Sequence, residues 1–529
     1  MRRGLPLLVL VGLTACGPEA QAPRAPVYDT GVAYLRPNEG TGGLWHYDPT
    51  DVIEQHDSAG GRFRVHYTRA GTHAVPSFDN DASGVPDYVE LVADSYEAVA
   101  TRYQDELGFR APISDETLSG DNGGDGRFDV YLLDFGLSSD GHFGTDACLV
   151  DNDTICLGHI LQENDFQGYG YPSLTFAARL LASHEYFHAV QAAYSIATDS
   201  IVSEGTAVWG SEIFDPATSD LRWQISGYLE NADRSLDVPL PGPVDRFSYG
   251  SSLWWQFLHE KYGPDFLRTL WEHLERGQGL AGGLDSPEQP LWIEQVDQLL
   301  QRDHQSSFAE AFETFCIWNL YLSAEADPAL SYAKGADYPR TKREPLAFPA
   351  EDPSLRLFHA SVKTFELQAA GRQTVDFALV DLPETAEDET AGLIVIGASR
   401  VAGEWVFFAD GEDGAAADGR ITLDATGTSE LLAMVINVER TGASKRPGLC
   451  AGSPEEVLAC LERLDPPPVC EPPEDCGGGG GGDPDPKGCG CTALRGPGVD
   501  PSGPALGLLL LGLALGARRR RRVGLLKIS

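Results

Sequence analysis

The amino-acid sequence predicts an α+β domain followed by a small all-β domain of the sandwich type. Strand-like and helix-like segments alternate over residues 61–345, whereas residues 346–445 contain short β-rich runs separated by Gly/Asp turns. The length of 529 residues exceeds the usual size of one domain. Both ends of the chain carry segments typical of export and processing, which we exclude from the predicted fold.

The composition is strongly acidic. The chain has 39 Lys and Arg residues against 79 Asp and Glu residues, which gives a formal net charge of −40. Phosphate binding requires clustered basic side chains, so this balance argues against nucleic acid as a partner. Hydrophobic residues make up 42% of the chain, which is enough for a core and excludes wholesale disorder.

The N-terminus has the pattern of a signal peptide. Two arginines precede an apolar stretch, and residues 13–16 read Leu-Thr-Ala-Cys. Residues 1–15 resemble a bacterial lipoprotein signal, which implies lipid on the thiol of Cys16 and attachment to a membrane through that anchor. The alternative is an ordinary secretory signal with an incidental cysteine. We expect an exported protein at the outer membrane or cell surface, with a tether or pro-segment over residues 16–60.

Four segments define the secondary structure expected in the larger domain. Arg62–Thr68 alternates with period two and predicts a strand. Tyr88–Leu107 and Thr175–Thr198 contain no internal Gly or Pro and predict helices. Leu253–Leu274 predicts a further helix, interrupted by a Gly-Pro pair.

The smaller domain is expected to be a β-sandwich followed by a stalk. Gly392–Ile396, Glu404–Phe408 and Glu430–Val438 read as strands bounded by turn residues. Residues 446–491 are rich in proline, glycine and cysteine, which predicts a disulfide-linked flexible stalk.

The ten cysteines fit an exported protein in an oxidising compartment. Cys148 and Cys156 lie close together in the sequence, and we expect them to pair. Two more bridges are expected among the cysteines that crowd the start of the stalk, namely Cys450, Cys460, Cys470 and Cys476. None of these pairs has the CxxC spacing of a zinc ribbon, which argues against structural zinc.

The tail, residues 492–529, contains the apolar run Ala505–Ala517 followed by the basic cluster Arg518–Arg522. A helix of this run would reach only about 20 Å, short of the ~30 Å hydrocarbon core of a bilayer. With two cysteines at residues 489–491, the tail resembles the MYXO-CTERM type of sorting signal, which is cut and replaced by a surface anchor. The alternative is a marginal transmembrane anchor held by its arginines.

The strongest chemical signal is the motif His184-Glu185-Tyr186-Phe187-His188. Residues four apart lie on one face of a helix, so His184 and His188 can present two imidazoles to one metal ion. Glu185 follows one position round the helix, where it can act as a general base for an activated water. The alternative is a pair of histidines on a solvated helix face.

A tetrahedral catalytic zinc site with two histidines needs a third protein ligand and an open position. The metzincin class would need Gly at position 191 and His at position 194. The chain has Gln191 and Tyr194, which excludes that class and leaves a carboxylate on a second helix.

Two glutamates are candidates for the third ligand, Glu204 and Glu212. In one helix they would stand about 12 Å apart along the axis, so both cannot reach the same ion. Glu204 is preferred because Gly205 and Ala207 would allow close packing against the histidine-bearing helix. Glu212 is expected to be solvated.

The two motifs together resemble the gluzincin type of zinc peptidase. Ser203–Trp209 is similar to the E-G-x-A-x-W stretch that supplies the glutamate ligand in such enzymes. Residues 61–345 as a whole resemble a family of metalloproteases found on myxobacterial cell surfaces. The resemblance implies a zincin-like fold, a zinc cofactor and a protein or peptide substrate. It assigns the metal to His184, His188 and Glu204, and the role of base to Glu185.

Residues Asp79–Glu90 fit the twelve-residue calcium loop, with a glycine at position six and a glutamate at position twelve. The expected Ca²⁺ ligands are Asp79, Asp81, Ser83, Val85, Asp87 and Glu90. An ordinary acidic turn is the alternative, because proline occupies position eight and a strand-like segment precedes the loop. Asp121–Asp129 is a looser version, equally consistent with cation binding and with a solvated turn.

Tyr249 precedes the helix predicted from Leu253, in the region where gluzincins often place a phenol that stabilises the transition state. It is a candidate catalytic residue, with a packing role as the alternative. The sequence thus predicts a zinc-dependent endopeptidase anchored at the cell surface. The competing class is a catalytically inactive, zincin-like adhesion or binding module. The presence of Glu185 and of all three ligand candidates favours the enzyme.

Overall fold

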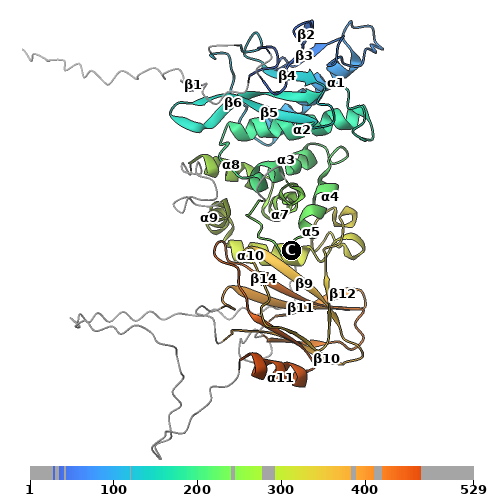
Figure 1. Ribbon diagram of the computed structural model, residues 1–529, viewed down its shortest axis with the longest axis vertical. Helices are drawn as coiled ribbons and strands as arrows, with labels where there is room; N and C mark the ends of the chain where they lie inside the picture. The colour runs from blue at the N-terminus through green and yellow to red at the C-terminus, as the bar shows by residue number, and fades with distance from the viewer. Residues whose placement is uncertain are drawn as a thin grey trace, which may run out of the picture. The chain divides into compact units, whose positions relative to one another are not determined.

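The computed structural model describes residues 28–29, 35–40, 43–118, 121–239, 245–276, 292–382, 389–409 and 420–465 (Figure 1). The chain divides into two compact units, Met1–Ile196 and Ala197–Ser529, and each is described by itself. This division differs from the boundary at residue 345 that the sequence suggested. The units are of mixed α/β type with three sheets among the described residues, and no described helix is both long and apolar enough to span a membrane.

The first unit contains a six-stranded sheet with the order β1-β5-β6-β4-β3-β2. The central strands β3, β4 and β6 are parallel, whereas β5 and β2 pair antiparallel to their neighbours. The predicted strand Arg62–Thr68 is confirmed as β3. The strand bounds are β1 Tyr28–Asp29, β2 Ile53–Asp57, β3 Phe63–Thr68, β4 Phe128–Leu133, β5 Gly141–Leu149 and β6 Asn152–Glu163.

Two long helices pack on this sheet, α1 (Asp87–Ala100) and α2 (Leu174–Ala192). The first continues into a π-helical turn, Thr101–Glu106, so the predicted helix over residues 88–107 is confirmed with a change of hydrogen-bond register at its end. Helix α2 begins where the Ser173 hydroxyl accepts the amide of Phe176 at 3.0 Å. It ends at Ala192, six residues earlier than predicted.

Strand β4 shows why both faces of the sheet are buried. Phe128 lies in ring contact with Tyr186 of α2, on the helix-covered face. Tyr131 and Leu133 point to the other face, where they pack with Tyr47 from the N-terminal segment. Part of the predicted tether or pro-segment therefore belongs to the core of the unit, and β2 adds a strand from the same segment.

The second unit begins with helices and two 3₁₀ turns. The predicted interruption of the helix over residues 253–274 is confirmed, because Gly263, with φ = 106°, ends the first of two helices there. The bounds are α3 Ser200–Phe214, α4 Leu221–Gln224, α5 Ser226–Leu229, α6 Arg246–Gly250, α7 Ser252–Tyr262, α8 Phe266–Arg276, α9 Trp292–His304, α10 Phe308–Trp318, η2 Ser323–Glu325 and η3 Gly335–Asp337.

Two sheets of mostly antiparallel strands follow, in the orders β13-β10-β15-β8 and β12-β11-β14-β9-β7. Strands β9, β10, β11, β12 and β14 are labelled in Figure 1. Side chains from both sheets form one buried cluster, with Phe377 and Leu423 from the first and Phe365 and Val435 from the second. The predicted sandwich is present. Its strands are β7 Glu344–Ala347, β8 Ala350–Asp352, β9 Ser361–Gln368, β10 Thr374–Val380, β11 Leu393–Val401, β12 Glu404–Ala409, β13 Arg420–Asp424, β14 Glu430–Asn437 and β15 Gly448–Gly452.

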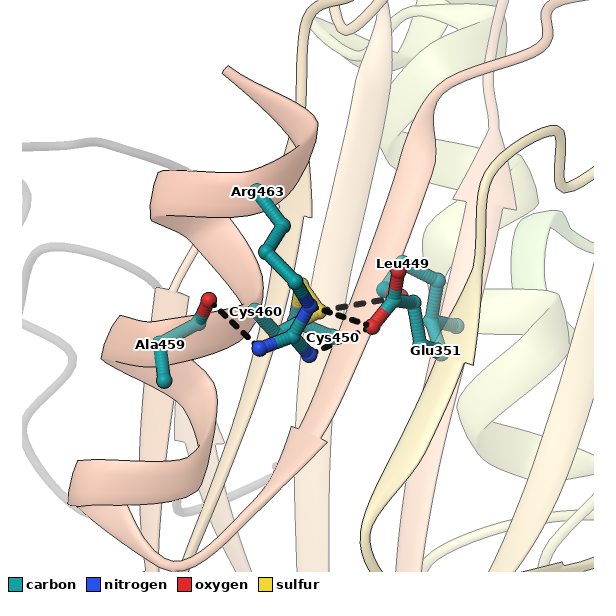
Figure 2. The surroundings of a disulfide bond; sticks show 6 residues. All are labelled: Glu351, Leu449, Cys450, Ala459, Cys460 and Arg463. Carbon is teal, nitrogen blue, oxygen red and sulfur yellow. Dashed lines mark hydrogen bonds and ion pairs between the residues drawn. A yellow bond between two sulfur atoms is a disulfide. The ribbon is translucent and has the colours of Figure 1, made fainter. Parts of the chain in front are cut away.

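The start of the predicted stalk is part of this sandwich. Strand β15 pairs with β10 and β8, and helix α11 (Pro454–Leu464) packs on β10 and β15. Figure 2 shows the Cys450–Cys460 disulfide joining β15 to α11 beside the Arg463–Glu351 ion pair. The sequence boundary at residue 445 therefore cuts through a folded sheet.

The predicted Cys148–Cys156 disulfide is also present, across the hairpin of β5 and β6. One of the two bridges expected among the stalk cysteines is Cys450–Cys460. Cys470 and Cys476 lie outside the described residues, as do Cys16 and the tail.

Candidate metal centre

The predicted metal motif lies inside α2, on a helix that its own aromatic residues fix to the sheet. Tyr186 packs edge-on against Phe63 of β3, and Phe187 packs edge-on against Tyr103. Both rings are buried. These contacts set the rotation of the helix, and the two histidines of the motif therefore lie on a different, half-exposed face.

The two histidines point at one another. Their Nε2 atoms lie 3.2 Å apart. Two imidazoles bound to one tetrahedral zinc, with Zn–N distances near 2.0–2.1 Å, would hold their nitrogens roughly 3.3 Å apart. The pair is therefore spaced as two ligands of a single ion.

A residue outside the motif sets the tautomer of His188. The Nδ1 of His188 lies 2.9 Å from Oε1 of Gln191, so the ring donates its Nδ1–H to that oxygen. The lone pair of Nε2 is then left to face His184, which is the form that a metal requires. The sequence offered a signal for this residue, because Gln191 stands three positions after His188 on the same helix face.

Glu204 is the third member of the group. Helix α3 begins after Asp199, whose carboxylate accepts the amide of Val202 at 3.1 Å, and Glu204 follows in its second turn. One ligand atom of each of His184, His188 and Glu204 lies within 4.8 Å of the other two, and all three residues are half-buried. The residues that the sequence assigned to zinc are thus brought together.

The surroundings of Glu204 differ from those expected. A Cβ atom on Gly205 would lie 2.2 Å from Ser251 Oγ and 2.5 Å from Trp255 Nε1. The glycine therefore allows α3 to approach α7, and the expectation that it makes room for the histidine-bearing helix was wrong.

Glu212 is not solvated, contrary to the expectation. It is only 7% exposed, and its carboxylate accepts a hydrogen bond from Lys334 Nζ at 2.7 Å. An ion pair gives this glutamate a structural role and leaves Glu204 as the ligand candidate on α3.

Glu185 is buried, at 6% exposure, beneath the first residue of β5. A Cβ atom on Gly141 would lie 2.7 Å from Glu185 Oε1, so a larger residue there would have to displace the glutamate side chain. Burial raises the pKa of the nearby Tyr96 phenol well above its ordinary value, and the charge of Glu185 adds to that rise. The Tyr96 phenol therefore stays neutral, and its hydroxyl donates a hydrogen bond to Oε1 of Gln162 at 2.9 Å.

Tyr249 lies on the short helix α6 of the second unit and is half-buried. Its backbone follows Asp245, which caps this helix by accepting the amide of Ser248 at 2.8 Å. Helix α6 packs against α3. Tyr249 is therefore on an element that contacts the helix of Glu204.

The predicted calcium loop is a tight turn that leads into α1. Ligand atoms of Asp79, Asp81 and Asp87 lie within 4.8 Å of one another. The carboxylate of Asp79 also accepts the amides of Ser83 and Gly84, at 3.1 and 2.9 Å. Glu90, the carboxylate expected at the last position of the loop, is not part of this group. The hydroxyl of Ser83 donates to the carbonyl of Val85.

A third group, Asp48, Asp51 and His73, has similar spacing. The backbone amide of Asp134 donates to Nδ1 of His73 at 3.1 Å. The neutral ring then carries its proton on Nε2, so neither nitrogen offers a lone pair to an ion. This hydrogen bond argues against a metal site there.

Comparisons with known proteins do not assign the chain to a family. No protein-family model matches the chain, and no curated protein matches it. One similar solved structure is an aminopeptidase A from Legionella pneumophila in complex with aspartic acid, with 11% identity and a TM-score of 0.29 over 79% of this chain and 40% of that one.

A second is a family GH115 4-O-methyl-alpha-glucuronidase with specificity for decorated arabinogalactans, with 9% identity and a TM-score of 0.13. That match covers 66% of this chain and 54% of the other. The chain thus spans about half or less of the length of both structures. Neither similarity is high enough to carry an argument about the fold or the activity.

Proposed function

We propose that this protein is a zinc-dependent endopeptidase anchored at the cell surface. The observation that carries the proposal is the group of His184, His188 and Glu204, whose ligand atoms lie within 4.8 Å of one another, with Glu185 beside it on the same helix as the histidines. Two imidazole nitrogens and one carboxylate oxygen form the donor set of many catalytic zinc sites.

The chemistry of the donors supports zinc over the alkaline-earth ions. Ca²⁺ and Mg²⁺ prefer all-oxygen sites, whereas imidazole suits zinc and its neighbours in the first transition row. Bound zinc would supply Lewis-acid activation of a water and of the scissile carbonyl. Three protein ligands leave the fourth position of a tetrahedral ion open for that chemistry.

The residues of the chain would then handle the proton. Glu185 accepts a proton from the attacking water and passes it to the leaving amine. Its side chain is buried and lies against Gly141 at the start of β5. Gln191 holds His188 in the tautomer that leaves Nε2 unprotonated.

A measurement on the wild-type protein tests the proposal. The purified protein should contain one equivalent of zinc and hydrolyse an internally quenched peptide library. Removal of zinc by 1,10-phenanthroline should abolish hydrolysis, and stoichiometric zinc should restore it. A zinc-loaded protein without hydrolysis of any library member would instead support the non-catalytic binding module.

The loop Asp79–Glu90 supports a second, structural proposal, in which Ca²⁺ stabilises the first unit. Three carboxylates held within ligand distance of one another repel when the site is empty, and an ion removes that repulsion. Lipid on Cys16 and removal of the tail complete the proposal for the anchor; both lie outside the described residues.

A further inference from the structure

The N-terminal segment crosses the face of the six-stranded sheet that the helices leave uncovered. We call its described residues, 35–40 and 43–52, the strap. Trp45 packs edge-on against Phe135, and the Tyr47 hydroxyl lies 3.0 Å from the carbonyl oxygens of His66 and Leu132. The strap thus places aromatic side chains against β3, β4 and the turn that follows β4.

Arg36 is the deepest residue of the strap. Its side chain is 1% exposed, and three carboxylates surround the guanidinium. Nη1 donates to Asp129 at 2.5 Å, and Nη2 lies 2.5 Å from both Asp115 and Asp146. The carboxylates come from a loop, from β4 and from β5, so one cation joins three separate parts of the unit.

The strand that supplies Asp146 is shaped for this contact. Pairing of β5 with β6 shifts register between Thr145 and Ala147, so Asp146 is the extra residue of a β-bulge. A bulge turns a side chain away from the face that strict alternation would give it. His159 of β6 then holds the second oxygen of Asp146 at 2.8 Å.

Asp129 is oriented in a similar way. Nε2 of His66 lies 2.7 Å from the second oxygen of Asp129, and the ring stacks on Tyr131 with centroids 4.2 Å apart. The hydroxyl of Tyr131 accepts from Arg36 at 3.4 Å. Each acid therefore has one oxygen fixed by the sheet and one turned to the guanidinium, apart from Asp115, whose Oδ1 has no partner.

We propose that this recess is a built guanidinium-binding site, and that Arg36 is the latch that closes the strap over the sheet. The inference does not depend on zinc or on hydrolysis. It follows that the strap is a permanent part of the first unit, and that any maturation cleavage lies before Leu35. The predicted tether or pro-segment over residues 16–60 would then be at most its first part.

The physical reason is the charge that would be left behind. Loss of the Arg36 side chain strands three carboxylates, which are between 2% and 5% exposed, without a cation. Removing one partner of a buried ion pair is strongly destabilising because the remaining charge stays buried. A lysine keeps the charge but lacks the fork that reaches three acids at once.

The test is chemical rescue of Arg36→Ala in the full chain. We expect the melting temperature of its first transition to fall by about 10 °C, and the Tyr47 amide to lose its protection from hydrogen exchange. Guanidinium chloride at about 20 mM should recover much of the loss by binding the folded state, whereas sodium chloride at the same ionic strength should not. Arg69→Ala, which removes an exposed ion pair with Glu54, is the matched control and should change little.

A melting temperature of Arg36→Ala within experimental error of wild type would overturn the proposal, as would equal effects of guanidinium and sodium. If Arg36→Ala does not fold, Arg36→Lys decides the matter. A lower melting temperature and faster Tyr47 exchange in that variant support the latch, and wild-type behaviour contradicts it.

Discussion

The Nε2 atoms of His184 and His188 lie 3.2 Å apart on one face of α2. Two partly exposed imidazoles seldom gain by such an approach unless they share a proton or an ion. The hydrogen bond from His188 Nδ1 to Gln191 places the proton of that ring on Nδ1, so its Nε2 can either accept a proton from His184 or bind an ion that both rings share. A shared cation is the arrangement that uses both lone pairs.

Substitution of the two glutamates of α3 should distinguish a metal-ligand role for Glu204 from a structural role for Glu212. Glu204→Ala should lose zinc affinity and activity together, because it removes one of three protein ligands. Glu212→Ala should keep zinc but unfold at a lower temperature, because it leaves Lys334 without its partner. Metal content of both purified variants by mass spectrometry checks the ranking, and a zinc-free Glu212→Ala beside a zinc-loaded Glu204→Ala would reverse the assignment.

Gln191 is expected to affect zinc binding indirectly, because it orients the ligand His188. Gln191→Leu should weaken zinc binding by about 10- to 100-fold, the usual cost of losing a partner that orients a ligand. Competition with a chromophoric chelator measures the affinity. Gln191→Glu, which keeps an acceptor for the Nδ1 proton, should restore most of it. Equal affinities for the leucine variant and the wild type would remove Gln191 from the site.

Calcium should raise the melting temperature of the protein. The expected reason is relief of repulsion among Asp79, Asp81 and Asp87, which stand within ligand distance. Melting curves with Ca²⁺ and with EGTA, in the presence of added zinc, measure the effect. Asp81→Asn should reduce the shift, whereas a wild-type curve insensitive to Ca²⁺ would make the loop an ordinary acidic turn.

The stability of the first unit should depend on the protonation of Asp115. Burial raises the pKa of this carboxyl to about 7, although Arg36 opposes the rise. In the unfolded chain its pKa is near ~3.9, so between that value and about 7 the native state holds a proton that the unfolded state has released. The contribution of Asp115 to stability is therefore present below about pH 4 and is lost as the pH rises to about 7.

Urea unfolding of Asp115→Asn across this window tests the sign. The variant cannot ionise at this position, so its stability relative to wild type should improve from pH 4.5 to pH 8. Asp105→Asn, an exposed carboxylate paired with Arg62, is the control and should run parallel to wild type. An Asp115→Asn curve that also runs parallel would contradict the pKa of Asp115.

The anchor is tested on protein from the native membrane. Intact-mass analysis should find lipid on Cys16 and no residues beyond about Cys491. An Arg518–Arg522 segment in the surface-exposed protein would contradict removal of the tail.

Much of the fold and the site could be predicted from local pattern. The alternation of period two in Arg62–Thr68 predicted strand β3, and the lack of internal Gly and Pro in Thr175–Thr198 predicted helix α2, because both patterns depend on local sequence alone. The spacing of four residues between His184 and His188 was enough to predict that both lie on one face of α2. Glu204 could be proposed because Ser203–Trp209 is similar to the stretch that supplies the glutamate ligand in gluzincins.

The rest depends on contacts between distant residues. Nothing local marks Arg36 as the cation for Asp115, Asp129 and Asp146, which follow it by 79, 93 and 110 positions. The neighbour of Gly205 could not be predicted for the same reason, because Trp255 is 50 positions away in the sequence. Prolines and glycines made residues 446–465 read as a stalk, although β15 completes a sheet with β10.

The most direct test of the central claim is Glu185→Gln, measured for zinc content and peptide hydrolysis in one preparation. The amide has the shape of the carboxylate but cannot accept a proton, so the variant should bind one zinc and lose hydrolysis by several orders of magnitude. A zinc-loaded Glu185→Gln protein that hydrolyses peptides at the wild-type rate would contradict the account.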